Sequence, residues 1–293
     1  KKYLSAMSTA KVDIVEIGFR FLPQKKFLGK FAYSEDDFLN SLSLPSNISY
    51  AVMINASDLI NYEDGLENAI NHLFSIKKDS PVDIIRIATH SSDIKECRTI
   101  AIALKNLGYR VFLNLMQIST LETKSITNIA KDIESWDCID AFYFADSFGN
   151  MEPELVSSVI STISSKWSGE MGIHTHDNKN QALGNSLKAI EQGITYVDAT
   201  VLGMGRGAGN AKIEALLVEI VQRGLGEYFP DALFSLVLKE FSLLQKEYNW
   251  GPNIYYFLSA VHGIHPTFIQ EMSADQRYTS EQIFSAINFL KTA

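Results

Sequence analysis

The sequence predicts an α/β protein built as a TIM (β/α)8 barrel whose first strand is missing from this chain. Seven short β-rich runs alternate with amphipathic helical segments, and most of the runs are continuously apolar, as parallel strands covered on both faces are. Polar side chains collect at the carboxyl ends of nearly all these runs. The 293 residues are enough for one domain of barrel size.

The predicted elements follow one another in a regular order. An apparent helix at 1–10 comes first, and the seven predicted strands then lie at 12–20, 48–55, 82–90, 109–117, 139–147, 171–178 and 195–203. Helical segments lie between them at 63–78, 93–108, 123–135, 153–167 and 180–193. Spacings of about 25 to 35 residues suit right-handed crossovers, in an open doubly wound sheet as in a barrel.

An eight-stranded barrel needs one more strand than the sequence offers. Because a helix precedes the first run, the absent strand should be the first, and we expect the N-terminal segment that holds it to have been cut off. After residue 225 the β rhythm stops and mainly helical segments follow. We therefore predict a barrel domain at 1–225 and a helical C-terminal region at 226–293.

Polar and ionisable residues gather where the predicted strands end. They are Glu16, Arg20, Asn55, Arg86, Thr89, His90, Asn114, Gln117, Asp146, His174, His176, Asp177, Asp198 and Thr200. All strand ends of a barrel open onto one mouth, where active sites lie, whereas an open sheet gathers only those near its switch point. The spread over all the strands favours the barrel.

Composition and charge exclude several classes of function. The formal charge of −8 disfavours nucleic acid or an anionic membrane as the main partner, because such surfaces are bound by clustered Lys and Arg. Cys97 and Cys138 have no CxxC spacing, so we interpret them as reduced structural thiols. With neither a membrane span nor a secretory signal in the sequence, we expect a cytoplasmic protein.

The stretch GIHTHDN, residues 172–178, places two histidines one residue apart on a predicted strand. Alternate residues of a strand point to the same face, so His174 and His176 can ligate one ion, whereas on a helix they would diverge. The other interpretation is a pair of hydrogen-bonded core histidines. Imidazole and carboxylate ligands suit Zn, Mn, Fe or Co, and Mg where oxygen ligands dominate.

The glycine-rich stretch GMGRGAGN, residues 203–210, follows the last predicted strand. It matches a loose dinucleotide-binding pattern, but the helix after it leads into no second strand ending in an acid. At a barrel mouth such a loop lets backbone approach a ligand closely, and Asn210 can add a carbonyl oxygen to the site. A flexible turn is the alternative for the individual glycines.

Four motifs together resemble those of the DRE-TIM metallolyase family, the HMG-CoA lyase-like superfamily. They are EIGFR (16–20), ADSFGNMEP (145–153), GIHTHDN and GMGRGAGN, and the resemblance covers roughly residues 10–220. It implies that His174 and His176 bind a divalent metal, with Mn2+ or Mg2+ expected first, and that Asn210 lies beside this metal or binds it. The family's remaining ligand, an aspartate in an LRDG-type motif on the first strand, is absent from this chain, so we expect weaker metal binding here than in the intact protein.

The resemblance further implies cleavage or formation of a C–C bond next to a 2-oxo acid or thioester. We assign Asp146 and His90 as candidate catalytic residues, His90 being one candidate for the base. The candidate substrate-binding residues are Glu16, Arg20, Asn55, Gly205 and Gly207. A short C-terminal region and a glycine loop without cysteine favour the 4-hydroxy-2-oxovalerate aldolase branch, which releases pyruvate or a related 2-oxo acid and an aldehyde.

Two other functions stay open at this point. One is a Claisen-type acyl-CoA/2-oxo acid synthase of the same family. The other is a non-catalytic barrel that binds a small molecule or a partner protein through the aromatic-rich segment 250–266. We expect a homo-oligomer, and the resemblance adds a complex with an aldehyde dehydrogenase, which no residue of the sequence itself indicates.

Overall fold

Seven strands form one sheet in which spatial order follows chain order from β1 to β7. The computed structural model describes residues 1–275 and 277–291. The strands are β1 (Ile14–Phe19), β2 (Ser49–Asn55), β3 (Ile84–Thr89), β4 (Arg110–Leu115), β5 (Ala141–Asp146), β6 (Glu170–Thr175) and β7 (Tyr196–Val197). Pairing is parallel at β1–β2, β2–β3, β3–β4 and β6–β7.

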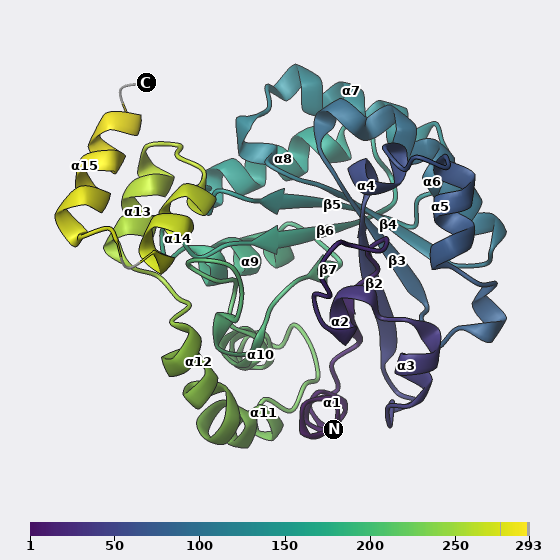
Figure 1. Ribbon diagram of the computed structural model, residues 1–293, viewed down its shortest axis with the longest axis horizontal. Helices are drawn as coiled ribbons and strands as arrows, with labels where there is room; N and C mark the ends of the chain where they lie inside the picture. The colour runs from purple at the N-terminus through teal and green to yellow at the C-terminus, as the bar shows by residue number, and fades with distance from the viewer. Residues whose placement is uncertain (276, 292–293) are drawn as a thin grey trace. The chain divides into compact units, whose positions relative to one another are not determined.

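This strand order confirms the predicted fold class. A doubly wound sheet reverses its order at a switch point, whereas the strands of a (β/α) barrel follow one another around it. β1 and β7 are the two ends of the order, which is where the sequence places the missing strand. In Figure 1 the labelled strands run in colour from the purple end of the bar at β2 to green at β7.

Helices follow most of the strands. Those of the barrel region are α1 (Lys2–Thr9), α2 (Lys30–Tyr33), α3 (Asp36–Asn40), α4 (Ala56–Ile60), α5 (Leu66–Leu73), α6 (Ile94–Asn106), α7 (Thr123–Glu134), α8 (Pro153–Ser164), α9 (Ala182–Glu191) and α10 (Ile213–Gln222). Short 3-10 turns lie at η1 (Lys77–Asp79), η2 (Ser91–Asp93), η3 (Ile118–Thr120) and η4 (Val201–Gly203). No helix in the described ranges is long and apolar enough to cross a membrane.

The chain divides into two compact units. The first contains residues 1–116, 123–143 and 163–171, and the second contains 117–122, 144–162 and 172–293. In the first unit β3 is buried along its whole length and α6 packs on β3 and β4. Both cysteines are buried free thiols, and burial raises the pKa of Cys97 to about 12. Such a thiol stays protonated and unreactive at neutral pH.

The helices that follow residue 226 belong to the second unit. They are α11 (Asp231–Leu236), the π-helical η5 (Val237–Phe241), α12 (Ser242–Tyr248), α13 (Ile254–Val261), α14 (Pro266–Ala274) and α15 (Ser280–Leu290). α13, α14 and α15 pack on one another, as Figure 1 shows in yellow-green and yellow. This helical region was expected; its boundary between 225 and 226 stays a prediction, and residues 276, 292 and 293 lie outside the described part.

A small core joins these last helices to the glycine-rich loop. Its buried members are Ala208, Tyr256, Ile264, Ile269, Ile283 and Ile287. Ala208 comes from the loop after β7, and the others come from α13, α14, α15 and the turn between α13 and α14. The C-terminal helices therefore support the loop that carries Asn210.

Candidate active site

The histidine pair stands at the carboxyl end of β6. His174 lies within the strand, and His176, just beyond it, forms an isolated antiparallel bridge with Asn210. The two ring centroids are 5.0 Å apart and the rings are inclined at 74°. The strand spacing thus brings both imidazoles and Asn210 into one neighbourhood of the second unit.

The His174 ring is oriented by Asp198, which follows β7. Its Nδ1 lies 2.9 Å from Asp198 Oδ2, and both side chains are largely buried. A carboxylate that accepts the N–H at Nδ1 fixes the tautomer in which Nε2 carries a lone pair. This is the support that metal-binding histidines usually receive.

His176 is held in its neutral form. Burial lowers its pKa to about 3, and the nearby His174 and Arg206 act in the same direction, while a hydrogen bond to the backbone of Gly209 acts against them. A metal ligand must be an unprotonated imidazole, so a low pKa favours ligation. The second nitrogen, away from Gly209, is the one suited to an ion.

Asn210 presents a buried oxygen toward this neighbourhood. Its Nδ2 donates to the Met204 carbonyl oxygen at 3.2 Å, which settles the orientation of the amide. Its Oδ1 is buried, and within the part of the chain that the structure describes no donor reaches it. A buried acceptor without a partner is costly, and a cation would relieve that cost.

These donors fit a divalent ion. Two imidazoles and one amide oxygen suit Mn, Zn, Fe or Co in general. Residues 1–275 and 277–291 contain no group of three or more His, Cys, Asp or Glu placed to hold a metal. The candidate donors among the described residues are therefore His174, His176 and Asn210, and their ligation of an ion stays a prediction.

The glycine-rich loop can follow its path because several of its positions leave no room for a side chain. A methyl group at Gly205 would come within 2.6 Å of Asn210 Nδ2, and one at Gly209 within 2.2 Å of the Gly203 carbonyl oxygen. Gly203, Gly207 and Gly209 also have positive φ. The predicted loop residues Gly205 and Gly207 therefore lie beside Asn210 and Tyr256; their contact with a substrate stays a prediction.

The segment before α13 anchors this loop from outside. Trp250 Nε1 donates to the Leu202 carbonyl oxygen at 3.0 Å, and the Gly251 N–H donates to the Gly207 carbonyl oxygen at 3.0 Å. A ring atom of Tyr256 lies 3.1 Å from where a Gly207 side chain would begin. These contacts hold the loop at Leu202, just before it, and at Gly207, within it.

Asp146, a predicted catalytic residue, ends β5 in the second unit. Its carboxylate accepts N–H groups of Asn150 at 3.0 Å and Met151 at 3.2 Å. Burial raises its pKa to about 6, and these hydrogen bonds and the charge of His174 oppose that rise. The carboxylate therefore orders the DSFGNM turn, and its catalytic role stays a prediction.

Four predicted residues belong to the first unit. Glu16 Oε2 pairs with Arg86 Nη1 at 2.9 Å, and Asn55 Nδ2 donates to Asp58 Oδ2 at 3.2 Å. His90 follows β3 and precedes η2. Their roles in substrate binding or catalysis stay predictions.

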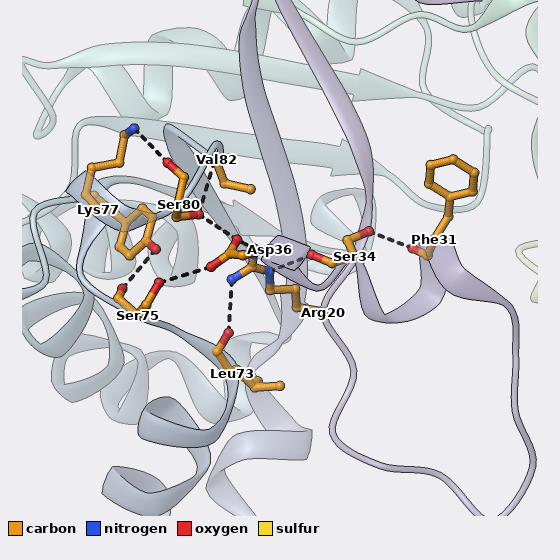
Figure 2. Close-up of polar contacts among 10 residues, drawn as sticks. Arg20, Phe31, Ser34, Asp36, Leu73, Ser75, Lys77, Ser80 and Val82 are labelled. Atoms are coloured by element: carbon orange, nitrogen blue, oxygen red, sulfur yellow. Dashed lines mark hydrogen bonds and ion pairs between the residues drawn. The ribbon is translucent and has the colours of Figure 1, made fainter. Parts of the chain in front are cut away.

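Arg20 is the fourth, and it is almost completely buried. Its Nε and Nη1 donate to the Ser34 and Leu73 carbonyl oxygens, each at 3.0 Å, and its Nη2 pairs with Asp36. Its guanidinium carbon lies 5.1 Å from the centre of the Phe74 ring. Figure 2 shows Ser34, Asp36 and Leu73 around it.

Asp36 extends the network. Its carboxylate accepts hydroxyl groups from Ser75 at 3.0 Å and from Ser80 at 2.7 Å, and Tyr109 donates to the Ser75 carbonyl oxygen. Each nitrogen of the Arg20 guanidinium is thus engaged by protein. The network supports a structural role for Arg20, and its assignment to the substrate stays a prediction.

Two residues near His176 escaped the sequence analysis as site residues. Arg206 is in the glycine-rich loop, and His265 precedes α14 with its ring 5.3 Å from that of Phe148. Both charges contribute to the low pKa of His176. Arg206 is the charged residue within GMGRG, and His265 lies in the HGIHP turn; these were the signals that the sequence offered.

The strand order, the histidine pair on β6 and the glycine-rich loop after β7 together define a barrel of the DRE-TIM class. The family model described as HMGL-like matches residues 81–239, just over half of the chain. The chain belongs to the HMGL-like family.

Relatives of known sequence agree with this family. A 4-hydroxy-2-oxovalerate aldolase of Carboxydothermus hydrogenoformans is 39% identical over 143 residues, covering 48% of this chain and 42% of that protein. One from Pseudomonas putida is 34% identical over 160 residues, covering 53% and 45%. The chain thus matches less than half the length of these curated relatives.

Solved structures agree with the fold. The N-terminal domain of a candidate aldolase from Bacteroides vulgatus has a TM-score of 0.84 and 30% identity, covering 97% of this chain and 91% of that one. An HMG-CoA lyase from Bacillus subtilis has a TM-score of 0.66 at 14% identity, covering 85% and 86%. At that identity the second likeness concerns the fold alone.

Proposed function

We propose that the protein is a divalent-metal-dependent aldolase that cleaves a C–C bond of a 4-hydroxy-2-oxo acid, giving pyruvate or another 2-oxo acid and an aldehyde. The observation that carries this proposal is the convergence of His174, His176 and Asn210, two imidazoles and an unpartnered amide oxygen. The names of the curated relatives support the choice of reaction.

Each residue has a defined task in this proposal. His174, His176 and Asn210 would hold the ion, with Asp198 keeping the His174 ring in place. When bound, a divalent ion, with Mn2+ or Mg2+ expected first, polarises the carbonyl oxygen of the 2-oxo acid and stabilises the negative charge that develops on it. The glycine-rich loop lets the backbone approach a small substrate.

The reaction also requires a base that accepts the proton of the C4 hydroxyl group as the C3–C4 bond breaks. His90 and Asp146 remain the candidates proposed from the sequence. Asp146 has the pKa of about 6 that suits proton transfer near neutrality, although its hydrogen bonds to the 150–151 backbone also serve the turn. A cytoplasmic homo-oligomer, with an aldehyde dehydrogenase as further partner, completes the proposal.

Activity tests this function directly. The protein in its full natural length, with Mn2+, is incubated with 4-hydroxy-2-oxopentanoate, and pyruvate is followed through lactate dehydrogenase. We expect pyruvate to form, a chelator to abolish its formation and Mn2+ or Mg2+ to restore it. His174→Ala should lower kcat/KM by about 100-fold or more, because it removes a metal ligand, whereas His72→Ala, on the exposed face of α5, should leave it unchanged.

Other outcomes would redirect the assignment. Consumption of acetyl-CoA with a 2-oxo acid acceptor, without cleavage of any 4-hydroxy-2-oxo acid, would indicate the synthase reaction instead. Binding of a small molecule with no turnover would favour the non-catalytic barrel.

A further inference from the structure

Arg206 holds a fixed position on the rim of the proposed metal site. It lies between Gly205, which abuts the side chain of Asn210, and Gly207, which abuts Tyr256. Its Nη1 donates to Thr267 Oγ1 at 3.1 Å, at the start of α14. The guanidinium is thus bonded to the start of α14, while the backbone of Arg206 belongs to the loop that carries Asn210.

Arg206 lacks the carboxylate partner that other arginines of the protein have. Arg86, Arg20 and Arg223 each pair with an acidic side chain. Within the described residues the Arg206 side chain makes a single hydrogen bond, to a neutral hydroxyl group. Several N–H groups of its fork therefore remain available, in a geometry that matches a carboxylate.

The Arg206 side chain is open to solvent. Partial burial lowers its pKa, although the side chain remains accessible to solvent. His265 Nδ1 accepts the Thr267 N–H at 3.4 Å and so orders the start of α14, where Thr267 bonds Arg206. Because Arg206 is exposed, an anionic ligand can reach the N–H groups of its guanidinium from solvent and form charge-assisted hydrogen bonds with them.

We propose that Arg206 is a specificity-determining residue that binds a second anionic group at the far end of the substrate, so that the preferred substrates are dianionic 4-hydroxy-2-oxo acids. The inference rests on the proposed function and deepens it. The 2-oxo acid end of such a substrate belongs at the metal donors, and a carboxylate on its C4 substituent belongs at Arg206. A substrate ending in a methyl group leaves the guanidinium unpaired.

Binding of two matched probes tests the inference without turnover. Isothermal titration calorimetry on the Mn2+-loaded protein in its full natural length compares 2-oxopentanedioate with 2-oxopentanoate, which differ in the second carboxylate. We expect the wild-type protein to bind the dianion about tenfold or more tightly, as a charge-assisted pair with arginine implies. Arg206→Gln should bring the two dissociation constants within about twofold of each other, because the glutamine amide carries no charge.

Three further variants sharpen the test. Arg223→Gln removes the same charge from the C-terminal end of α10, where Arg223 pairs with Glu191 and Glu219, and should keep the preference. Arg206→Lys should keep part of it, since the charge stays and the fork is lost. Thr267→Val should weaken it while leaving the arginine in place.

Several results would overturn the inference. They are equal affinity for the two probes in the wild-type protein, a preference that survives in Arg206→Gln, and loss of the preference in Arg223→Gln. Failure of both probes to bind would overturn it as well. The aldolase proposal fails separately, when a protein that binds the dianion with the expected preference cleaves no 4-hydroxy-2-oxo acid.

Discussion

Arg20 brings a positive charge into the interior of the first unit, where Asp36 and two carbonyl oxygens receive it. Arg20→Met would leave Asp36 and the carbonyl oxygens of Ser34 and Leu73 without this donor. Removing one partner of such a buried pair is expected to lower the free energy of unfolding by about 2 to 4 kcal/mol. Urea denaturation followed by circular dichroism measures the change.

Arg223→Met provides the matched control. Arg223 pairs with Glu191 and Glu219 at the surface, and its loss should change stability by roughly 0.5 kcal/mol or less. If both variants lost the same small amount, the network would not stabilise the fold. Unchanged stability together with weakened probe binding in Arg20→Met would favour the substrate role predicted from the sequence.

Residues differ in how far the sequence predicts their environment. His174 and His176 share a neighbourhood because period-two alternation is a local property, so GIHTHDN was enough to pair them. The partners of Arg20 come from positions 34, 36 and 73, which no local pattern joins to it. Because Arg20 is a polar residue directly after a strand, the sequence placed it at the barrel mouth. Its side chain is instead buried in a hydrogen-bond network.

The glycine-rich loop is the element on which the donor set depends most. A methyl group at Gly209, where φ is +79°, would lie 2.2 Å from the Gly203 carbonyl oxygen. Gly209→Ala should therefore displace the loop and Asn210 with it, and should weaken Mn2+ binding by about tenfold or more, as loss of ligand orientation does. Calorimetric titration with Mn2+ gives the affinity.

Gly224→Ala is the control that separates the cost of a left-handed backbone from the steric clash expected in Gly209→Ala. Gly224 has a similar φ of +67°, but nothing lies within 4 Å of its added methyl group. Both variants carry the cost of an L-residue in the left-handed region, about 1 to 2 kcal/mol, and we expect Gly224→Ala to keep full Mn2+ affinity. Equal Mn2+ affinity in Gly209→Ala and Gly224→Ala would show that the loop tolerates the displacement.

Most elements lay close to their predicted ranges, and β7 shows why one did not. The sequence predicts a strand over 195–203, whereas β7 covers Tyr196–Val197. Beyond it Thr200 bridges to Lys212, and Leu202 adopts a positive φ within η4. A β-rich composition predicts extended chain over 195–203. It does not predict that Thr200 will pair with Lys212, which follows the glycine-rich loop.

At the scale of the whole molecule, the C-terminal helices make contacts with the glycine-rich loop that hydrophobic periodicity did not predict. Their helical character follows from the apolar spacing, whereas the contact of Thr267 with Arg206 joins residues 61 positions apart. Likewise, Ala208 belongs to the core of α13, α14 and α15. The aromatic-rich segment 250–266 was considered as a binding surface in the sequence analysis. Two of its aromatic residues, Trp250 and Tyr256, contact the glycine-rich loop.

Metal binding and the stability of the whole chain should be coupled. The folded protein brings His174, His176 and Asn210 together, whereas the unfolded chain scatters them, so an ion bound by the folded form stabilises it by mass action. With free Mn2+ at 100 times its dissociation constant, the free energy of unfolding should rise by about 2.7 kcal/mol. Thermal unfolding with and without Mn2+ measures the shift in Tm.

Two histidine variants show whether the Mn2+-dependent shift in Tm comes from the proposed site. His174→Ala should remove most of it, because a site with so few protein donors cannot lose an imidazole and keep its affinity. His72→Ala, in which the substituted histidine is exposed on α5, should show the full wild-type shift. An equal Mn2+-dependent shift in His174→Ala would place the ion elsewhere in the protein and would remove the basis of the metal-dependent mechanism.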